Sequence, residues 1–203
     1  MNPDLTEKEA NLIRESIRKK YSQVAASGPG TCFRYPTGAE GLTQQNYPLE
    51  LLQDFPSFLI DSFCGVGNPF SLGPIHPGEA VLDIGCGAGL DTLLAAKMAG
   101  PEGRVIGLDA TPGMIERAKA NAALLALPNV TFMVGAAESL PFPDDDFEVV
   151  ISNGVFNLTL DKEKALKEAH RVLKPGGRLL LADMVLVGEL PPDKAGKIEN
   201  WYQ

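Results

Sequence analysis

A glycine-rich run, Asp83-Ile-Gly-Cys-Gly-Ala-Gly89, constrains the fold of this chain more than any other feature of the sequence. The apolar residues 80–84 before it predict a buried strand, and the pattern over residues 90–98 behind it predicts a helix. Glycines at such a turn let a ligand come close to the backbone where the helix begins. The run therefore predicts an α/β fold with a ligand site at the end of its first strand.

The alternation of apolar strands and amphipathic helices continues along the chain. Turns rich in Pro, Gly and Asp separate the segments, and apolar runs such as Leu179-Leu-Leu-Ala182 indicate strands buried on both faces. A Rossmann-like, doubly wound, mainly parallel sheet with helices on both faces follows. The further strands are expected at residues 105–108, 130–134, 147–152 and 178–184, and the further helices at 112–125 and 161–173.

The N-terminal 77 residues have a different character from residues 78–203, and we expect the two parts to form one compact unit. Thr6-Glu-Lys-Glu9 has capping-box spacing and predicts the start of an amphipathic helix that packs on the domain. Residues 28–48 are rich in Gly, Pro and Thr, which predicts an irregular segment. A second helix is expected over residues 49–63.

Charge and cysteine content argue against several kinds of partner. Eighteen basic against 26 acidic residues give a net charge of −8, which would repel a phosphate backbone. The three cysteines lack the paired spacing of a disulfide framework or a zinc site, which fits a reducing cytoplasm. The N-terminus lacks the pattern of a signal peptide, and the most apolar segment, 179–187, is too short to cross a bilayer. We therefore expect a cytoplasmic protein that binds no metal, nucleic acid or membrane.

The residues after the glycine run indicate a nucleoside ligand. Gly85-x-Gly87-x-Gly89 departs from a dinucleotide fingerprint, because leucine stands where the third glycine of that fingerprint belongs, so an NAD-dependent oxidoreductase is disfavoured. Asp109 ends the second predicted strand about 20 residues past the loop, where a carboxylate can bind a ribose diol. Thr111, followed by proline, predicts a hydroxyl-capped helix start that brings Met114 near the adenine.

These motifs resemble those of the class I S-adenosylmethionine-dependent methyltransferases. The resemblance covers residues 78–187 and rests on the glycine run together with Gly107-Leu-Asp109, Ala137-Glu-Ser-Leu-Pro-Phe-Pro143 and Arg171-Val-Leu-Lys-Pro-Gly-Gly177. It implies S-adenosylmethionine as the cofactor and the class I type of sheet.

The resemblance also implies roles for individual residues. Asp83 and the backbone of residues 85–89 would hold the methionine moiety, Asp109 the ribose, and Ala137 with Glu138 the adenine edge. The predicted cofactor-binding residues are Asp83, Gly85, Cys86, Gly87, Gly89, Asp109, Ala110, Met114, Ala137, Glu138 and Asn153.

A narrower similarity links the chain to arsenite methyltransferases and related small-molecule methyltransferases. It rests on Phe63-Cys-Gly-Val-Gly-Asn-Pro69, on Val150-Ile-Ser-Asn-Gly-Val-Phe-Asn-Leu158 and on Asp161-Lys162.

The cysteines of that family are missing from these motifs. Val66 and Gly154 stand where the family has cysteines, and a third ligand would lie past the last residue of the chain. Trivalent arsenic needs soft thiolate ligands, so the arsenic site is not implied here. A displaced site built from Cys32 and Cys64 has no further support in the sequence.

Five side chains allow either a functional or a purely structural interpretation. Asn153 follows the fourth predicted strand and opens on the crevice, so it could bind cofactor or acceptor. Asp183 could do the same or could cap a turn. Cys86 is interpreted as a small residue packed against the ligand, His170 as a helix-surface residue, and His76 as an exposed loop residue.

The leading hypothesis is an S-adenosylmethionine-dependent methyltransferase that acts on a small molecule. The cofactor methyl group is already activated, so alignment supplies most of the catalysis and no catalytic residue is assigned. The aromatic-rich segment 21–47 is expected to close over the cofactor as a lid, with Tyr21 and Tyr35 as contacts. The alternative is a non-catalytic module that binds or senses the cofactor, and arsenite methyl transfer ranks below both.

The end of the sequence has no room for the last two strands of the usual class I sheet. Only residues 193–203 follow the turn Gly188-Glu-Leu-Pro-Pro192. We expect either a shortened chain or a homo-oligomer in which another subunit covers the exposed edge of the fifth strand.

Overall fold

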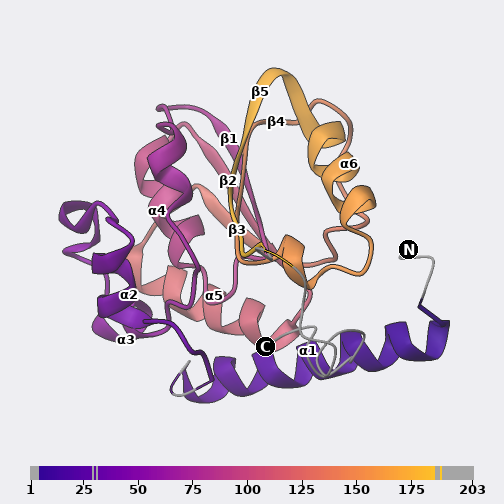
Figure 1. Cartoon of the computed structure of the whole chain (residues 1–203). Coiled ribbons are helices and arrows are strands. Elements are labelled where there is room, and N and C mark those ends of the chain that lie inside the picture. Colours follow the sequence, from indigo (N-terminus) through magenta and orange to yellow (C-terminus); the bar gives the residue numbers. More distant parts are fainter. Residues whose placement is uncertain (1–4, 29, 31, 186–187, 189–203) are drawn as a thin grey trace.

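The computed structural model describes residues 5–28, 30, 32–185 and 188. At its centre lies a parallel sheet with the strand order β3-β2-β1-β4-β5 (Figure 1). The chain moves outward from β1 to β3 and then crosses to β4 on the other side of β1. This reversal opens a crevice at the carboxyl ends of β1 and β4. The strands are β1 Ala80–Ile84, β2 Arg104–Asp109, β3 Val130–Val134, β4 Phe147–Asn153 and β5 Leu173–Ala182.

Helices cover both faces of the sheet, as the alternating pattern predicted. α4 (Leu90–Ala99) and α5 (Pro112–Leu125) lie on one face, and α6 (Lys162–Val172) lies on the other (Figure 1). Every residue of β1 is buried, which explains its continuous apolar run. Leu93 and Leu94 of α4 are fully buried against this face, and burying each such side chain stabilises the fold by about 1.5–3 kcal/mol. The Rossmann-like α/β prediction is confirmed.

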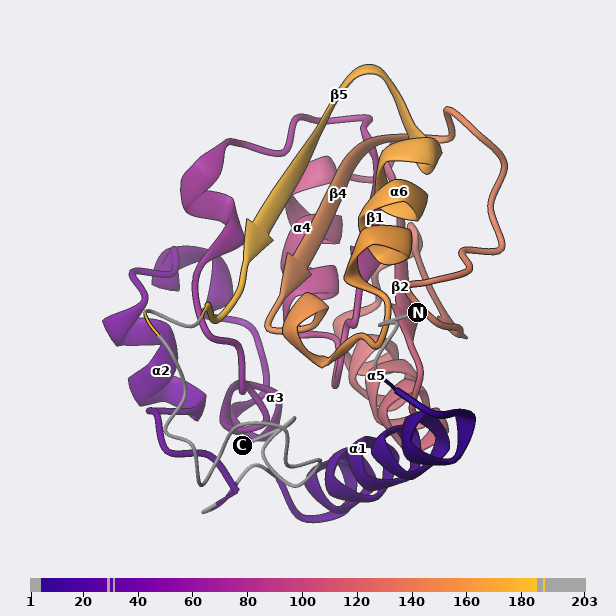
Figure 2. The ribbon, with the colours of Figure 1, turned by 45° about the vertical axis from the view of Figure 1, so that its right-hand side comes forward.

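Helix α1 (Glu7–Ser27) lies across the carboxyl ends of the strands (Figure 2). Its start is the predicted capping box, in which the Thr6 hydroxyl accepts from the Glu9 amide and the Glu9 carboxylate accepts from the Thr6 amide. Buried Ile13 packs with Leu160, and the Arg117 guanidinium of α5 donates to a carbonyl near the other end of the helix. α1 therefore covers the crevice.

The N-terminal part differs from the sequence expectation in two places. The segment 28–48 is not wholly irregular, because it contains α2 (Gly38–Gln44), whose Leu42 is buried in the core. The helix expected over residues 49–63 is two short elements, η1 (Leu49–Leu52) and α3 (Ser57–Asp61). Pro56 lies between them, and its missing amide hydrogen and restricted ring prevent one continuous helix. A short helix η2 (Pro69–Leu72) follows.

The last strand also begins earlier than expected. Its register with β4 shifts from Phe147↔Leu173 to Val149↔Arg178, so residues 174–177 form a bulge within β5 instead of a separate turn. The strand ends at Ala182, two residues before the predicted end. The prediction about residues 193–203 lies outside the described residues. The division of the chain at residue 78 stays a prediction.

Candidate functional site

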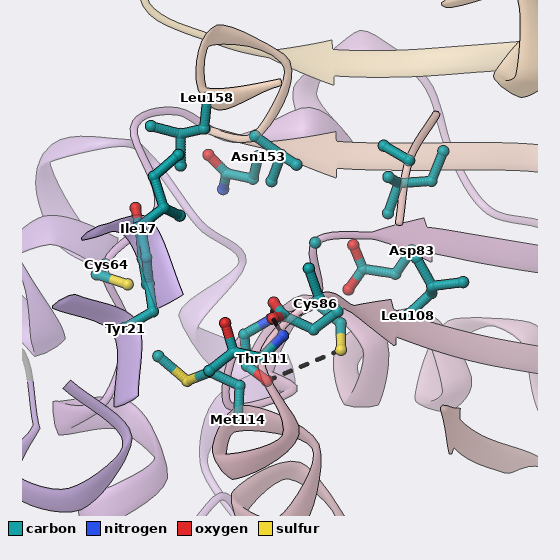
Figure 3. Close-up of a pocket in the computed structure, with 18 of the residues that line it drawn as sticks. Ile17, Tyr21, Cys64, Asp83, Cys86, Leu108, Thr111, Met114, Asn153 and Leu158 are labelled. Atoms are coloured by element: carbon teal, nitrogen blue, oxygen red, sulfur yellow. Dashed lines mark hydrogen bonds between the residues drawn. The ribbon is translucent and has the colours of Figure 1, made fainter. Parts of the chain in front are cut away.

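A cavity of about 260 Å³ lies where the carboxyl ends of β1, β2 and β4 meet α1 (Figure 3). All but one of the predicted cofactor-binding residues line it. Those lining residues are Asp83, Gly85, Cys86, Gly87, Asp109, Ala110, Met114, Ala137, Glu138 and Asn153.

The glycine loop is fixed to the end of β2 by its backbone. The amides of Gly85 and Cys86 both donate to the carbonyl of Leu108, over 2.7 and 3.0 Å, and the amide of Gly87 donates to Asp109 Oδ2 over 3.0 Å. Three amides that the sequence led us to expect at a ligand are therefore turned toward β2. The loop presents few free donors for a phosphate, which also argues against a dinucleotide.

Gly89 is the one predicted cofactor-binding residue that does not line the cavity. It is the N-cap residue of α4 with φ +94°, and a Cβ there would lie 3.1 Å from both Ala118 Cβ and Phe132 Cζ. The third glycine of the run is required for close packing of α4 against α5 and β3.

Asp109 joins the glycine loop to the start of α5. Its Oδ2 accepts from the Gly87 amide and its Oδ1 accepts from the Thr111 amide over 2.8 Å. Burial raises the pKa of Asp109, although these two hydrogen bonds favour the charged form. Thr111 is the N-cap residue, but its hydroxyl makes no capping hydrogen bond, contrary to the expectation. A carboxylate can accept about four hydrogen bonds, so Asp109 has capacity left for a ligand.

Asp83, at the end of β1, is almost fully buried, with 2% of its surface exposed. Its Oδ2 accepts from the Thr92 hydroxyl over 2.6 Å. Burial, followed by the charge of Asp91, raises the pKa of Asp83 well above its usual range.

Asp91, in the first turn of α4, also lines the cavity and was missed by sequence reasoning. Its Oδ1 accepts from the Tyr47 hydroxyl over 2.8 Å and its Oδ2 from Asn153 Nδ2 over 3.0 Å. Burial raises the pKa of Asp91 to about 6. An aspartate two residues past the last glycine was the only sequence signal for it.

Asn153 holds a neighbouring loop as well as Asp91. Its Oδ1 accepts from the amides of Val66 and Gly67 over 2.8 and 3.2 Å, and its Nδ2 also donates to the Gly67 carbonyl over 2.8 Å. Most of the hydrogen-bonding capacity of this side chain is therefore used inside the protein. Asn153 lies in the cavity wall, as predicted, but its side chain mainly holds the loop at Val66 and Gly67.

The three aspartates of the cavity are Asp83, Asp91 and Asp109. They form no ion pair within the described part of the chain, although Arg14 and Arg18 of α1 also line the cavity. Two of the three are buried, and the hydrogen bonds they accept come from neutral groups. Buried carboxylates without a counter-ion are costly unless a ligand supplies the positive charge.

The rest of the wall is mainly apolar. Met114 and Ala137 are buried at one end, where Glu138 Oε1 accepts from the Leu160 amide over 3.2 Å. Ile17 and Tyr21 of α1 face the cavity from the side opposite Asp83 and Cys86 (Figure 3). Tyr21 was predicted as a lid contact, whereas Ile17 carried no sequence signal for a site.

Several other candidates lie away from the cavity or have other contacts. Tyr35 does not line the cavity, and its hydroxyl donates to the Cys64 carbonyl. Asp183 accepts from the amides of Asn157 and Met184, which is the turn-capping role. Both histidines, His76 and His170, are exposed.

The cysteines belong to no group of three potential metal ligands among the described residues. Burial raises the pKa of the Cys64 thiol to about 12 and also raises that of Cys86, so both are protonated at neutral pH, while Cys32 is exposed. A Cβ at Gly154 would lie 3.2 Å from Val66 Cγ1, so these two positions are neighbours and neither carries a thiol. Among the described residues, no three His, Cys, Asp or Glu side chains are grouped to hold a metal.

The sequence of this chain is similar to those of known methyltransferases. Residues 75–203 match the family model described as a methyltransferase domain. The chain is 36% identical to an arsenite methyltransferase of Halobacterium salinarum over 93% of its own length and 51% of that protein. It is 39% identical to a ubiquinone/menaquinone biosynthesis C-methyltransferase of Pasteurella multocida over 63% of this chain and 47% of that protein. The chain thus spans about half the length of these relatives.

Solved structures show the same fold. An arsenic(III) S-adenosylmethionine methyltransferase of Chlamydomonas reinhardtii matches with a TM-score of 0.61 and 39% identity, over 66% of this chain and 48% of that one. A SAM-dependent methyltransferase of Aquifex aeolicus matches with a TM-score of 0.54 and 28% identity, over 62% and 70%. None of the helices described here is long and apolar enough to span a membrane. The resemblance to class I methyltransferases is confirmed, and the chain belongs to the methyltransferase domain family.

Proposed function

We propose that the cavity binds S-adenosylmethionine and that the protein transfers its methyl group to a small molecule. The observation that carries this proposal is the set of three aspartates, Asp83, Asp91 and Asp109, that share one cavity and form no ion pair among the described residues. A nucleoside that bears a sulfonium and an ammonium group complements this charge. The glycine loop supports the same ligand, because a Cβ at Gly87 would meet nothing within 4 Å and the backbone is open there.

The strand order gives the proposed binding mode. β1 lies between β2 and β4, so a ligand that spans the crevice passes from Asp109 through Asp83 to Asp91. We propose that Asp109 accepts from the ribose, that Met114, Ala137 and Glu138 surround the adenine, and that Asp83 and Asp91 face the methionyl part.

When bound, S-adenosylmethionine supplies an activated methyl group, and the protein has to align the acceptor with it. Ile17, Tyr21 and Leu158 line the cavity, and we propose that these side chains limit the access of water and hold the acceptor in line. No side chain has to remove a proton from an acceptor that is already nucleophilic, so we assign no catalytic residue.

The names of the relatives indicate the chemical class of the methyl acceptor but do not identify the acceptor of this protein. These names specify arsenite in one case and ubiquinone/menaquinone biosynthesis in the other, and both point to small molecules. Arsenite held by thiolates does not fit the neighbouring positions Val66 and Gly154. We therefore propose a small-molecule acceptor other than arsenite and a cytoplasmic location. A homo-oligomer that covers β5 stays a prediction for sedimentation analysis.

Calorimetry with S-adenosylmethionine tests the cofactor assignment. Asp109→Ala is expected to weaken binding about 100-fold, because two hydrogen bonds from the ribose to a carboxylate are lost. Glu116→Ala, which removes an exposed carboxylate of α5 outside the cavity, is the control and should bind like the wild type. Equal binding by wild type and Asp109→Ala would refute the assignment.

Incubation with methyl-labelled cofactor and a metabolite extract tests the enzymatic activity. Transfer of label to any small molecule is the expected result and excludes the non-catalytic alternative. Tight cofactor binding without transfer to any acceptor would instead favour a sensor module.

The lid hypothesis makes a separate prediction. The ring centroids of Tyr21 and Phe33 are 6.3 Å apart and those of Phe33 and Tyr35 are 5.2 Å apart, so these aromatic rings pack on one another next to the point where Tyr21 lines the cavity. Bound cofactor is expected to slow proteolysis within the segment 21–47 at least several-fold. The reason is that the protease cleaves the open segment, whereas the cofactor binds only when the segment is closed. An unchanged cleavage rate would contradict a lid.

A further inference from the structure

Three polar side chains from distant parts of the chain meet beside the cavity. Tyr47 follows α2, Asp91 lies in the first turn of α4 and Asn153 ends β4. Each pair is joined by a hydrogen bond of 2.8 to 3.0 Å. Tyr47 is 4% exposed and Asp91 8% exposed, so the cluster is largely removed from water.

The hydrogen bonds of this cluster leave Asp91 ready to bind a further donor. Each carboxylate oxygen of Asp91 accepts one hydrogen bond, from a phenol and from an amide, and each retains a free lone pair. Neither donor carries a charge. A ligand with a positive charge and several N–H groups would satisfy both the lone pairs and the charge.

The position of Asp91 along the crevice decides which part of a ligand it meets. Asp109 marks the β2 end and Asn153 the β4 end, with β1 between them. Asp91 bonds to Asn153, so it lies at the end opposite the proposed ribose site. An adenosine that binds at Asp109 therefore extends its 5′ substituent toward Asp91.

We infer that Asp91 binds the α-ammonium group of the cofactor, and that Tyr47 and Asn153 are positioning residues that orient its carboxylate. The inference rests on the proposed function and adds a binding residue to it. The methionyl ammonium is the cationic N–H donor at the 5′ end of the cofactor. Asp91 thereby makes the site specific for adenosyl compounds that carry an amino acid.

Two ligands separate this role from a structural one. S-adenosylhomocysteine and 5′-methylthioadenosine share the adenosine and a neutral thioether, and only the first carries the amino-acid group. Asp91→Asn is expected to weaken S-adenosylhomocysteine binding by about 10- to 100-fold and to change 5′-methylthioadenosine binding less than twofold. The measurement is calorimetry of the full chain with each ligand.

Two variants that each lose one hydroxyl group test the positioning role of Tyr47. Tyr47→Phe removes the hydroxyl donated to Asp91 but keeps the ring packed on Phe63 and Phe70, so it should weaken S-adenosylhomocysteine several-fold and leave 5′-methylthioadenosine unchanged. Ser71→Ala removes an exposed hydroxyl of η2 that donates to the Asn68 carbonyl, and because neither residue lines the cavity it should affect neither ligand.

The outcomes distinguish this inference from the function on which it rests. Equal loss of both ligands in Asp91→Asn, or no loss of S-adenosylhomocysteine, would overturn the ammonium assignment while cofactor binding stands. Failure of the wild type to bind either ligand would overturn the proposed function and the inference together.

Discussion

Replacing Gly85 by alanine is expected to lower the free energy of unfolding by about 2–5 kcal/mol and to abolish cofactor binding. Gly85 has φ +77°, a left-handed conformation that costs an alanine about 1–2 kcal/mol. A Cβ there would also lie 2.7 Å from Val155 Cγ1 and 2.9 Å from Val155 Cβ. A rotamer change of Val155 cannot remove the second contact, so the backbone of the loop has to move.

Two further variants separate strain from collision. Gly78 has φ +87° but open space around a Cβ, so Gly78→Ala should lose only the conformational part, about 1–2 kcal/mol. Adding Val155→Ala to Gly85→Ala removes the Cγ contacts and should restore part of the stability. Denaturant unfolding of the four proteins, wild type included, measures these differences. Equal stability of the Gly85→Ala and Gly78→Ala variants would show that the collision is absent.

The sequence was sufficient to predict what depends on local patterns. The strands β1 to β4 and the helices α4 and α5 follow from apolar periodicity and from turn residues, and the position of the cavity at the end of β1 follows from the glycine run. Predictions went wrong where a local rule competes with packing. α2 forms in a Gly-rich segment because Leu42 is anchored in the core. Gly89 packs α4 against α5 and β3, whereas Gly85 and Gly87 line the cavity.

The Asp91 cluster could not be predicted because its contacts are not local. Tyr47 and Asp91 are 44 positions apart, and Asn153 and Tyr47 are 106 apart. No spacing rule connects such residues, and Asp91 by itself reads as an acidic residue in the first turn of a helix. Only the tertiary structure shows that this aspartate is buried, lines the cavity and forms no ion pair with any described residue.

The raised pKa of Asp91 predicts that the unliganded protein loses stability between about pH 4 and pH 6 as the pH rises. Burial raises the pKa of Asp91 from 3.8 to about 6, so between these values the folded state holds a proton that the unfolded state has released. Stability is then greatest below the unfolded pKa and falls as the pH approaches the folded pKa. The full difference is about 3 kcal/mol for this group.

Cofactor affinity should show the opposite trend and rise at least tenfold between pH 5 and pH 7. An ammonium group binds Asp91 only when the carboxylate is ionised, so each pH unit below about 6 weakens binding about tenfold, and the raised pKa of Asp83 steepens the dependence. Tyr47 and Cys64, the other titratable neighbours, stay protonated throughout because burial raises the pKa of both.

Calorimetry of S-adenosylhomocysteine binding from pH 5 to pH 8, in buffers of different ionisation enthalpy, measures both the affinity and the proton released. Asp91→Asn should flatten the pH dependence, and 5′-methylthioadenosine should show a shallower one with wild type, because it brings no ammonium group to Asp91. A pH dependence of the same slope for both ligands would place the titrating group elsewhere. If the proposed binding mode holds, the carboxylates that destabilise the unliganded fold at neutral pH are also the groups that select a cationic cofactor, since none of them forms an ion pair within the described residues.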